Sequence, residues 1–298
     1  MSDTAIAIVL ALLAGLSYAT AAVLQQRVAA QQAPELSLSP RLILALFRRP
    51  LWLLGGVFDL AAYGCEAGAL AAGSVVIVGP LLVSGLLFAL PLATVGQHVR
   101  VTRREMVPAV FVTAGLAVYV AVSQPRGTSS HATTLGWLLA GGVVALVAGA
   151  AVVIGRRAAT APNERALLYG VATGTIYGLT AILTKATVDL FGDGVLDAFT
   201  HWQPYVLVGA SIIGMVLNQS AFQAGHVAAS LPAIAVVNPV LASTFGVLLF
   251  HEHFDASGPV AWIATVLAII AMTAGTVRLA RSPLVAHAHS ESESIASK

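Results

Sequence analysis

Nine apolar segments, each long enough to cross a bilayer, are the feature that most constrains the fold of this chain. A transmembrane α-helix needs about 20 consecutive, mainly apolar residues. Such segments lie at 4–27, 51–71, 74–97, 106–123, 134–155, 166–188, 204–224, 230–250 and 258–279. Of the 298 residues, 58% are hydrophobic and only 9% are charged, whereas a soluble domain carries about 25% charged residues. We therefore predict an all-α polytopic membrane protein with nine transmembrane helices.

The composition also narrows the classes of function. The formal net charge is only +2, and no basic stretch carries interleaved aromatic residues, so we expect no nucleic-acid partner. The single cysteine, Cys65, excludes a disulfide within the chain and a cysteine-based zinc site. The sequence holds no phosphate-binding glycine loop, nucleophile elbow or paired-histidine zinc motif. We therefore expect a protein that is not an enzyme and has no cofactor.

The Lys and Arg residues that flank the apolar segments predict the orientation. Membrane proteins accumulate these residues on the cytoplasmic side. Nine spans with the N-terminus outside and the C-terminus inside place thirteen of them there: Arg27, Arg41, Arg48, Arg49, Arg100, Arg103, Arg104, Arg156, Arg157, Arg165, Arg278, Arg281 and Lys298. Only Arg126 falls in a loop on the other side. A topology with eight or ten spans would instead distribute these Lys and Arg residues over both sides of the membrane.

Two polar stretches are predicted to lie outside the bilayer core. Residues 36–49 are typical of a short interfacial helix, which Pro40 opens and Pro50 follows. Residues 282–298 are rich in Ser, Glu and His, which predicts a disordered cytoplasmic tail. Arginine strongly outnumbers lysine, and Ala, Val and Gly are abundant. These features indicate a multi-pass protein of a bacterial cytoplasmic membrane.

An internal repeat follows from two sequence shifts. A shift of 159 residues aligns identical residues of the two halves: Gly15 with Gly174, Tyr18 with Tyr177, Pro80 with Pro239 and Ser84 with Ser243. A shift of 157 aligns residues 67–73 with 224–230. The repeated units, 4–123 and 165–279, have opposite orientations in the nine-span topology, and 134–155 is the linking helix. Residues 1–298 then form one transporter domain, because inverted repeats are typical of alternating-access transporters.

Several short motifs in both halves resemble those of a known superfamily: 15–18 (GLSY), 23–27 (VLQQR), 79–91 (GPLLVSGLLFALP), 219–225 (QSAFQAG) and 238–243 (NPVLAS). The chain resembles the EamA-like drug/metabolite transporter superfamily, and within it the NIPA-type magnesium transporters and their actinobacterial relatives. This resemblance implies a secondary transporter. Its members move cations, amines, amino acids, nucleotide precursors or lipid-linked sugars. The resemblance also leads us to expect glutamine at Glu66 and glutamate at Asn238, so this chain departs from it at both positions.

Two carboxylates within the second span are the strongest chemical feature of the sequence. Asp59 and Glu66 are seven residues apart, which places them about 20° apart around a helix and about 10.5 Å apart along it. Tyr63 lies between them in sequence. Charged residues in a span are costly and mark substrate or ion pathways. The pair could carry a coupling proton or bind a hydrated divalent cation, or each could be satisfied structurally by a hydrogen bond from a neighbouring helix.

Uncharged polar residues in other spans extend this candidate site. The residues concerned are hydroxyl and amide side chains on the repeat-leading and later helices: Tyr18, Gln25, Gln26, Tyr177, Asn218, Gln219, Gln223 and Asn238. Each could line the pathway or serve as an interhelical hydrogen-bond partner. Pro80 and Pro239 could hinge their helices, because proline removes a backbone donor.

Three hypotheses about function follow. The first is a secondary transporter that moves a small solute by alternating access, coupled to a proton or an ion. The second is a NIPA-like magnesium or divalent-cation permease, in which Asp59 and Glu66 would bind the metal. The third is a membrane assembly partner without transport activity, for which Gly141, Gly142 and Gly149 offer a small-residue face where two copies could pair.

Overall fold

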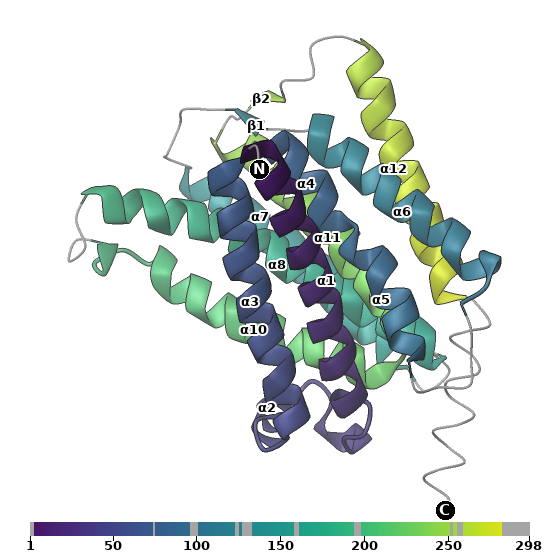
Figure 1. Ribbon diagram of the computed structural model, residues 1–298. Coiled ribbons are helices and arrows are strands. Elements are labelled where there is room, and N and C mark those ends of the chain that lie inside the picture. Colours follow the sequence, from purple (N-terminus) through teal and green to yellow (C-terminus); the bar gives the residue numbers. More distant parts are fainter. Residues whose placement is uncertain are drawn as a thin grey trace, which may run out of the picture.

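Helices make up nearly all of the described chain in the computed structural model (Figure 1). The structure describes residues 3–73, 75–95, 101–122, 125–126, 133–157, 161–193, 198–250, 253–254 and 259–281. Within these ranges, nine helical segments are long and apolar enough to cross a membrane, and one of them, Ile77–Thr94, covers parts of both α4 and α5. This confirms the all-α polytopic fold class. The elements are α1 (Asp3–Ala29), η1 (Pro34–Leu36), α2 (Pro40–Leu46), α3 (Pro50–Ala72), α4 (Val75–Val83), α5 (Gly85–Thr94), α6 (Arg103–Val122), β1 (Pro125–Arg126), α7 (Thr134–Gly155), α8 (Pro162–Asp193), α10 (Gln203–Ala224), α11 (Val227–Phe250), β2 (His253–Phe254) and α12 (Pro259–Ala280).

The predicted span 74–97 differs most from the structure, because it is interrupted at Ser84 between α4 and α5. The Ser84 hydroxyl donates to the Leu81 carbonyl at 2.6 Å, so the backbone makes a local turn instead of a continuous helix. Gly85 follows, and a Cβ there would lie 2.7 Å from the carbonyl oxygen of Gly15. The interruption therefore lies where this segment makes close backbone contact with α1.

The short segment after α1 contains the predicted interfacial helix in a shorter form. α2 begins at Pro40, whose preset φ suits the first helical position, and the Ser39 side chain caps it by accepting from the Arg41 amide. α2 ends at Leu46, and α3 begins at Pro50. The predicted tail, residues 282–298, lies outside the described residues.

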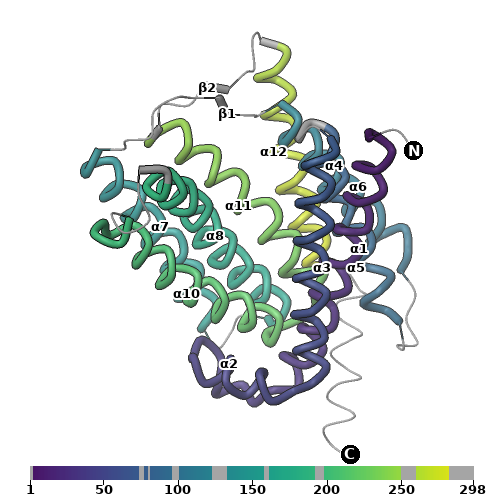
Figure 2. Tube along the Cα trace, turned by 60° about the vertical axis from the view of Figure 1, so that its left-hand side comes forward, coloured from purple at the N-terminus to yellow at the C-terminus, as the bar shows by residue number. Residues whose placement is uncertain are grey.

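The spanning helices pack as two groups that meet around α11 (Figure 2). In one group, α1 packs against α3, α4 and α5, and α6 packs against α12. In the other, α8 packs against α7, α10 and α11. Helix α11 also contacts α5, α6 and α12, and α1 contacts α10, so the two groups share an interface. A cavity lined from both groups lies at this interface.

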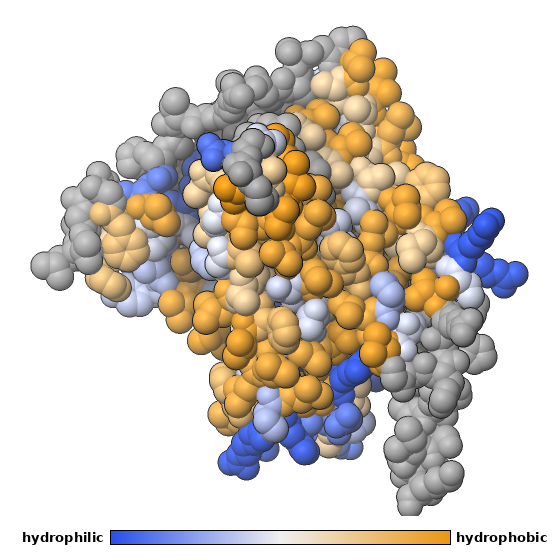
Figure 3. All heavy atoms as spheres, in the orientation of Figure 1, coloured by the Kyte–Doolittle hydropathy of each residue, from blue (hydrophilic) through white to orange (hydrophobic). Residues whose placement is uncertain are grey.

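The outer surface has the character expected of a protein in a lipid bilayer. Large apolar side chains are exposed along the outer faces of α3, α7, α10 and α12. Figure 3 shows apolar residues over most of the visible surface, with hydrophilic residues gathered near α2 and where α6 begins. An exposed apolar surface of this extent is stable only in a nonpolar environment.

Candidate functional site

A cavity of about 560 Å³ lies among α1, α3, α4, α5, α6, α8, α10 and α11. Its wall is mainly apolar, formed by Leu, Val, Ile and Ala side chains. The polar side chains in the wall are Tyr18, Gln25, Asp59, Glu66, Tyr177, Asn218 and Asn238. Apolar cavities with a few convergent polar groups are the usual form of a small-ligand site. The structure therefore brings most of the sequence-predicted site residues into one cavity.

Glu66 is held by a side chain from the neighbouring helix. The Tyr18 hydroxyl, on α1, donates to Oε2 of Glu66, on α3, at 2.7 Å. α1 and α3 pack side by side over much of their length, and Gly68 allows Leu10 to approach within 3.2 Å of its Cβ position. The second carboxylate oxygen of Glu66 makes no hydrogen bond to the described residues and remains available to a ligand.

Asp59 lies at the end of a chain of hydrogen bonds that crosses three helices. The indole nitrogen of Trp52 donates to Oε1 of Gln219 at 3.1 Å. The Gln219 amide donates to Oε1 of Gln25 at 2.9 Å, and the Gln25 amide donates to Oδ2 of Asp59 at 2.5 Å. Every bond runs in the same direction, so the chain presents an N–H group to the carboxylate. Gln25 and Gln219 are both almost fully buried, which makes these bonds costly to break.

The chemistry of the cavity favours a cationic or proton-carrying ligand. Asp59 and Glu66 supply carboxylate oxygens, while Tyr18, Asn218 and Asn238 add hydroxyl and amide groups. No arginine or lysine is part of the lining. Among the described residues, no group of three or more His, Cys, Asp and Glu side chains could hold a metal ion. Magnesium retains several of its waters and needs only one or two protein carboxylates, so either carboxylate of the cavity supplies a ligand of the type it prefers.

Four predicted site residues lie outside the cavity wall, and one of them, Gln26, donates to the Gly225 carbonyl at 3.1 Å. Tyr63 is 68% exposed on the outer face of α3, because a residue four positions after Asp59 is turned about 40° further around the helix. Gln219 lies behind Gln25, which it positions. Gln223 donates to the Ala33 carbonyl at 2.7 Å, so it holds the segment after α1. Its Oε1 is buried without a hydrogen-bond partner.

Of the two prolines that we predicted to act as helix hinges, only Pro239 has its side chain within the described part of the structure. Pro239 lies inside α11 and contributes to the cavity wall, next to Asn238. Pro80 lies within α4, but its side chain is outside the described part of the structure. The helix interruption at Ser84 comes four residues after Pro80. The missing N–H of Pro80 frees a carbonyl four residues earlier in the chain, so it does not account for the interruption at Ser84.

Polar contacts from the last turns of α1 connect it to neighbouring helices. The Arg27 guanidinium donates to the carbonyls of Leu92 at 3.1 Å and Val95 at 2.6 Å, at the end of α5. The Gln26 amide donates to the Gly225 carbonyl, between α10 and α11, at 3.1 Å. These bonds connect α1 to both groups of helices. We call this region the α1 latch.

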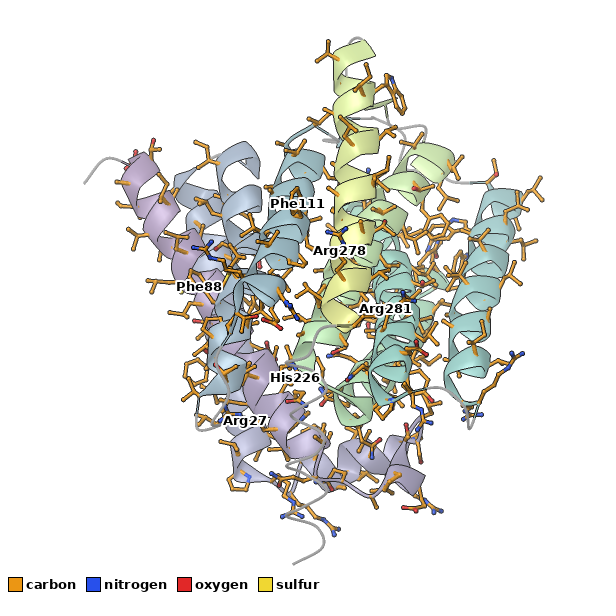
Figure 4. All side chains as sticks on the ribbon, turned by 90° about the vertical axis from the view of Figure 1, so that its right-hand side faces the viewer. Arg27, Phe88, Phe111, His226, Arg278 and Arg281 are labelled. Atoms are coloured by element: carbon orange, nitrogen blue, oxygen red, sulfur yellow. The ribbon has the colours of Figure 1, made fainter. Side chains whose placement is uncertain are left out.

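His226 completes the α1 latch beside Arg27, as Figure 4 shows. Its Nδ1 accepts a hydrogen bond from the Ala228 amide at 3.1 Å, so it caps the start of α11. An accepting Nδ1 requires the neutral ring with its hydrogen on Nε2. Burial, together with the nearby positive charge of Arg27, lowers the pKa of His226 to about 4. The histidine is therefore neutral near pH 7.

Sequence reasoning missed two residues that organise the site. Trp52 is the first donor in the chain that leads to Asp59, but near the start of a span it is typical of an interfacial anchor. Arg27 was counted only as a flanking charge, whereas its side chain binds the end of α5. Neither role has a local sequence signal, because both partners lie far away in the chain.

The comparisons with known proteins give one relative of similar length. An uncharacterized protein of Corynebacterium glutamicum is 29% identical over 286 residues, which cover 95% of this chain and 97% of the relative. No family model matches the chain, and no solved structure matches it. The chain is therefore similar along almost its whole length to a corynebacterial protein to which no function has been assigned.

Proposed function

We propose that this chain is a secondary transporter that moves a small solute across the cytoplasmic membrane by alternating access, coupled to a proton or a cation. The observation that carries the proposal is the cavity between the two groups of helices, in which Asp59 and Glu66 are each held by a side chain from α1. Intramembrane carboxylates that face a cavity are typical of ion and proton pathways.

The packing of the helices supports an inverted-repeat architecture. α1 packs on α3 and on α4 with α5, while α8 packs on α10 and α11 in the same order. The fourth helices of the proposed units, α6 and α12, pack against each other. Tyr18 and Tyr177, which the 159-residue shift aligns, both line the cavity. A site at the interface of two such units is the usual arrangement in transporters of this kind.

The α1 latch supports alternating access between these units. In the proposed orientation, with the N-terminus outside, the latch lies at the cytoplasmic end of the cavity. Its bonds from Arg27 and Gln26 connect helices that would separate when this end opens. They are few and end on backbone carbonyls, so a modest free energy of ligand binding or protonation can break them.

A divalent-cation permease is the second candidate function. The observation that favours it is the presence of two carboxylates with amide and hydroxyl oxygens in one wall. The resemblance to NIPA-type magnesium transporters points in the same direction. In this version Asp59 and Glu66, which lie about 10.5 Å apart along α3, hold a partly hydrated Mg²⁺ one after the other along the pathway, and no separate coupling ion is needed.

The test compares purified wild-type protein with Glu66→Gln and Asp59→Asn variants in proteoliposomes. One batch contains a magnesium dye and a second contains a pH dye. Mg²⁺ is added to the first, and amines, amino acids and nucleotide precursors are added in turn to the second. Glu35→Gln is the matched control, because it removes an exposed carboxylate at η1, away from the cavity.

Magnesium influx that both cavity variants lose, and the control retains, would establish the permease. Solute-dependent proton movement with the same pattern would establish the proton-coupled transporter. Transport that survives in the Asp59→Asn/Glu66→Gln double variant would show that the carboxylates play no part. No flux of any probe in folded, correctly inserted wild type would count against the transporter and favour an assembly role for the small-residue face of α7.

A further inference from the structure

A second pocket, separate from the cavity, lies at the surface between the start of α6 and the end of α12. It has a volume of about 470 Å³ and is lined by Arg103, Arg104, Val107, Pro108, Val277, Arg278 and Arg281. Four of its seven residues are arginines, and all four are exposed. We call it the arginine pocket. Nothing in the proposed transport cycle uses it.

Close packing of two helices brings these arginines together. A Cβ at Gly275 would lie 2.8 Å from the Pro108 carbonyl, and one at Gly115 would lie 2.9 Å from the Ala268 carbonyl. The absence of side chains at the two glycines therefore lets α6 and α12 approach each other closely. Arg278 and Arg281 are three residues apart, so they share one face of α12. In Figure 4 they lie on successive turns at the lower end of that helix.

The positive charge of the pocket is not neutralised within the described part of the chain. Among the described residues, no hydrogen bond or ion pair engages the guanidinium group of any of the four arginines. The nearest carboxylate along α6, Glu105, is buried and accepts from the Thr102 amide at 2.9 Å and from the Thr102 hydroxyl. Glu105 is therefore engaged by Thr102 and is not part of the lining of the arginine pocket. Without a bound anion, the positive charges of the four arginines therefore repel one another.

The apolar part of the pocket continues toward the middle of the spans. Val107 and Val277 are partly exposed below the arginines, and Phe111, one turn further along α6, is 56% exposed. Arginines at the helix ends with exposed apolar residues directly below them match a molecule with a charged head and an apolar chain. A freely soluble anion would make no contact with the apolar strip formed by Val107, Phe111 and Val277.

We propose that the arginine pocket binds the phosphate headgroup of an anionic phospholipid, whose acyl chains lie along the apolar strip of α6 and α12. Guanidinium groups bind phosphate oxygens through paired N–H donors, and basic pockets between transmembrane helices bind such headgroups. Four arginines exceed the charge of one phosphate. Cardiolipin, which carries two phosphates, therefore binds more tightly than phosphatidylglycerol.

Native mass spectrometry of the full-length protein in neutral detergent tests the proposal. Cardiolipin, phosphatidylglycerol and phosphatidylcholine are titrated separately onto the wild type and an Arg278→Gln/Arg281→Gln variant. The matched control is Arg48→Gln/Arg49→Gln, which removes the same charge from two exposed arginines between α2 and α3. A third variant, Arg278→Lys/Arg281→Lys, keeps the charge but loses the paired donors and guards against misfolding of the glutamine variant.

The expected order of retention on the wild type is cardiolipin, then phosphatidylglycerol, then phosphatidylcholine. Loss of Arg278 and Arg281 weakens cardiolipin binding by about tenfold or more, the lysine variant is intermediate, and the control is unchanged. Equal losses in the Arg278/Arg281 and Arg48/Arg49 variants would overturn the proposal. So would displacement of the lipid by inorganic phosphate at an equal phosphorus concentration, because the site would then select a free anion.

Discussion

Helices α3 and α8 line the same cavity, but they are held in place differently. Within the most apolar stretch of each helix, the protein buries only 17% of α3 but 61% of α8. α3 carries both cavity carboxylates and is tied to α1 by side-chain hydrogen bonds. α8 contributes Tyr177 and packs through glycines against α11. Both carboxylates of the cavity therefore belong to the helix that the protein buries less. We expect conformational change to begin on the α1–α3 side.

The largest effect is expected where the rigid region is overpacked. A Cβ at Gly174 would lie 2.8 Å from Cβ of Val237 and 3.1 Å from the Ile234 carbonyl. Overpacking by a methylene or two costs about 1–3 kcal/mol, so Gly174→Leu should cost more and reduce the yield of monodisperse protein. Gly141→Leu is the control, because nothing lies within 4 Å of its Cβ position. Similar yields for the two variants would mean that α8 and α11 are not rigidly packed.

The α1 latch, which connects the two regions, should make stability depend on pH. The pKa of His226 is about 4 in the folded protein, below its ordinary value of 6.5. The unfolded chain therefore takes up a proton between these values that the folded protein excludes. Stability should be full above pH 6.5 and should fall by on the order of 2–3 kcal/mol as the pH drops toward 4.

Thermal unfolding in detergent between pH 4 and 8 measures this effect. His226→Asn keeps an oxygen that can cap α11 but cannot be protonated, so its Tm should depend less on pH in this range. A Tm profile for His226→Asn that matches the wild type would assign the pH dependence to other groups.

A smaller effect is expected when the hydrogen-bond chain to Asp59 is cut. Gln25→Leu leaves the Gln219 amide and Asp59 without partners, which should cost about 1–3 kcal/mol because both groups are at least partly buried. A double-mutant cycle with Gln219→Leu checks this, using Tm in detergent. The two losses should fall well short of additive, since either substitution breaks the same chain. Full additivity would show that the bonds act independently.

The smallest effect is expected at the single bond to Glu66. Tyr18→Phe removes one hydrogen bond and should lower stability by about 1 kcal/mol, while transport of the identified substrate falls. Tyr63→Phe is a matched control on α3, because its side chain faces outward and does not line the cavity. If both substitutions change transport equally, the Tyr18–Glu66 bond has no special role.

The positions of the spans could be predicted from the sequence, because the lengths and boundaries of apolar runs follow directly from the bilayer thickness. The segment 134–155 agrees with α7 at both ends. The interruption at Ser84 could not be predicted, because it depends on contact with Gly15 of α1. In the cavity, the placement of Asp59 and Glu66 on one face followed from helical periodicity. The outward position of Tyr63 shows how little angular error that argument tolerates.

The identity of the polar partners could not be read from the sequence. Gln25 and Gln219 are 194 residues apart, and nothing in either motif specifies which amide meets which carboxylate. Such pairs are set by the crossing of helices, which depends on small residues throughout both spans.

The direction of the hydrogen-bond chain restricts where Asp59 can carry a proton. The indole of Trp52 can only donate, so the Gln219 and Gln25 amides cannot turn around without leaving that N–H unpaired. Oδ2 of Asp59 thus always receives an N–H, and a proton can be added only at Oδ1. A tryptophan near the opposite end of the chain of bonds thereby dictates the protonation site of an aspartate. Trp52→Phe would remove the indole N–H. The amides of Gln219 and Gln25 would then be free to rotate, and either carboxylate oxygen of Asp59 could take the proton.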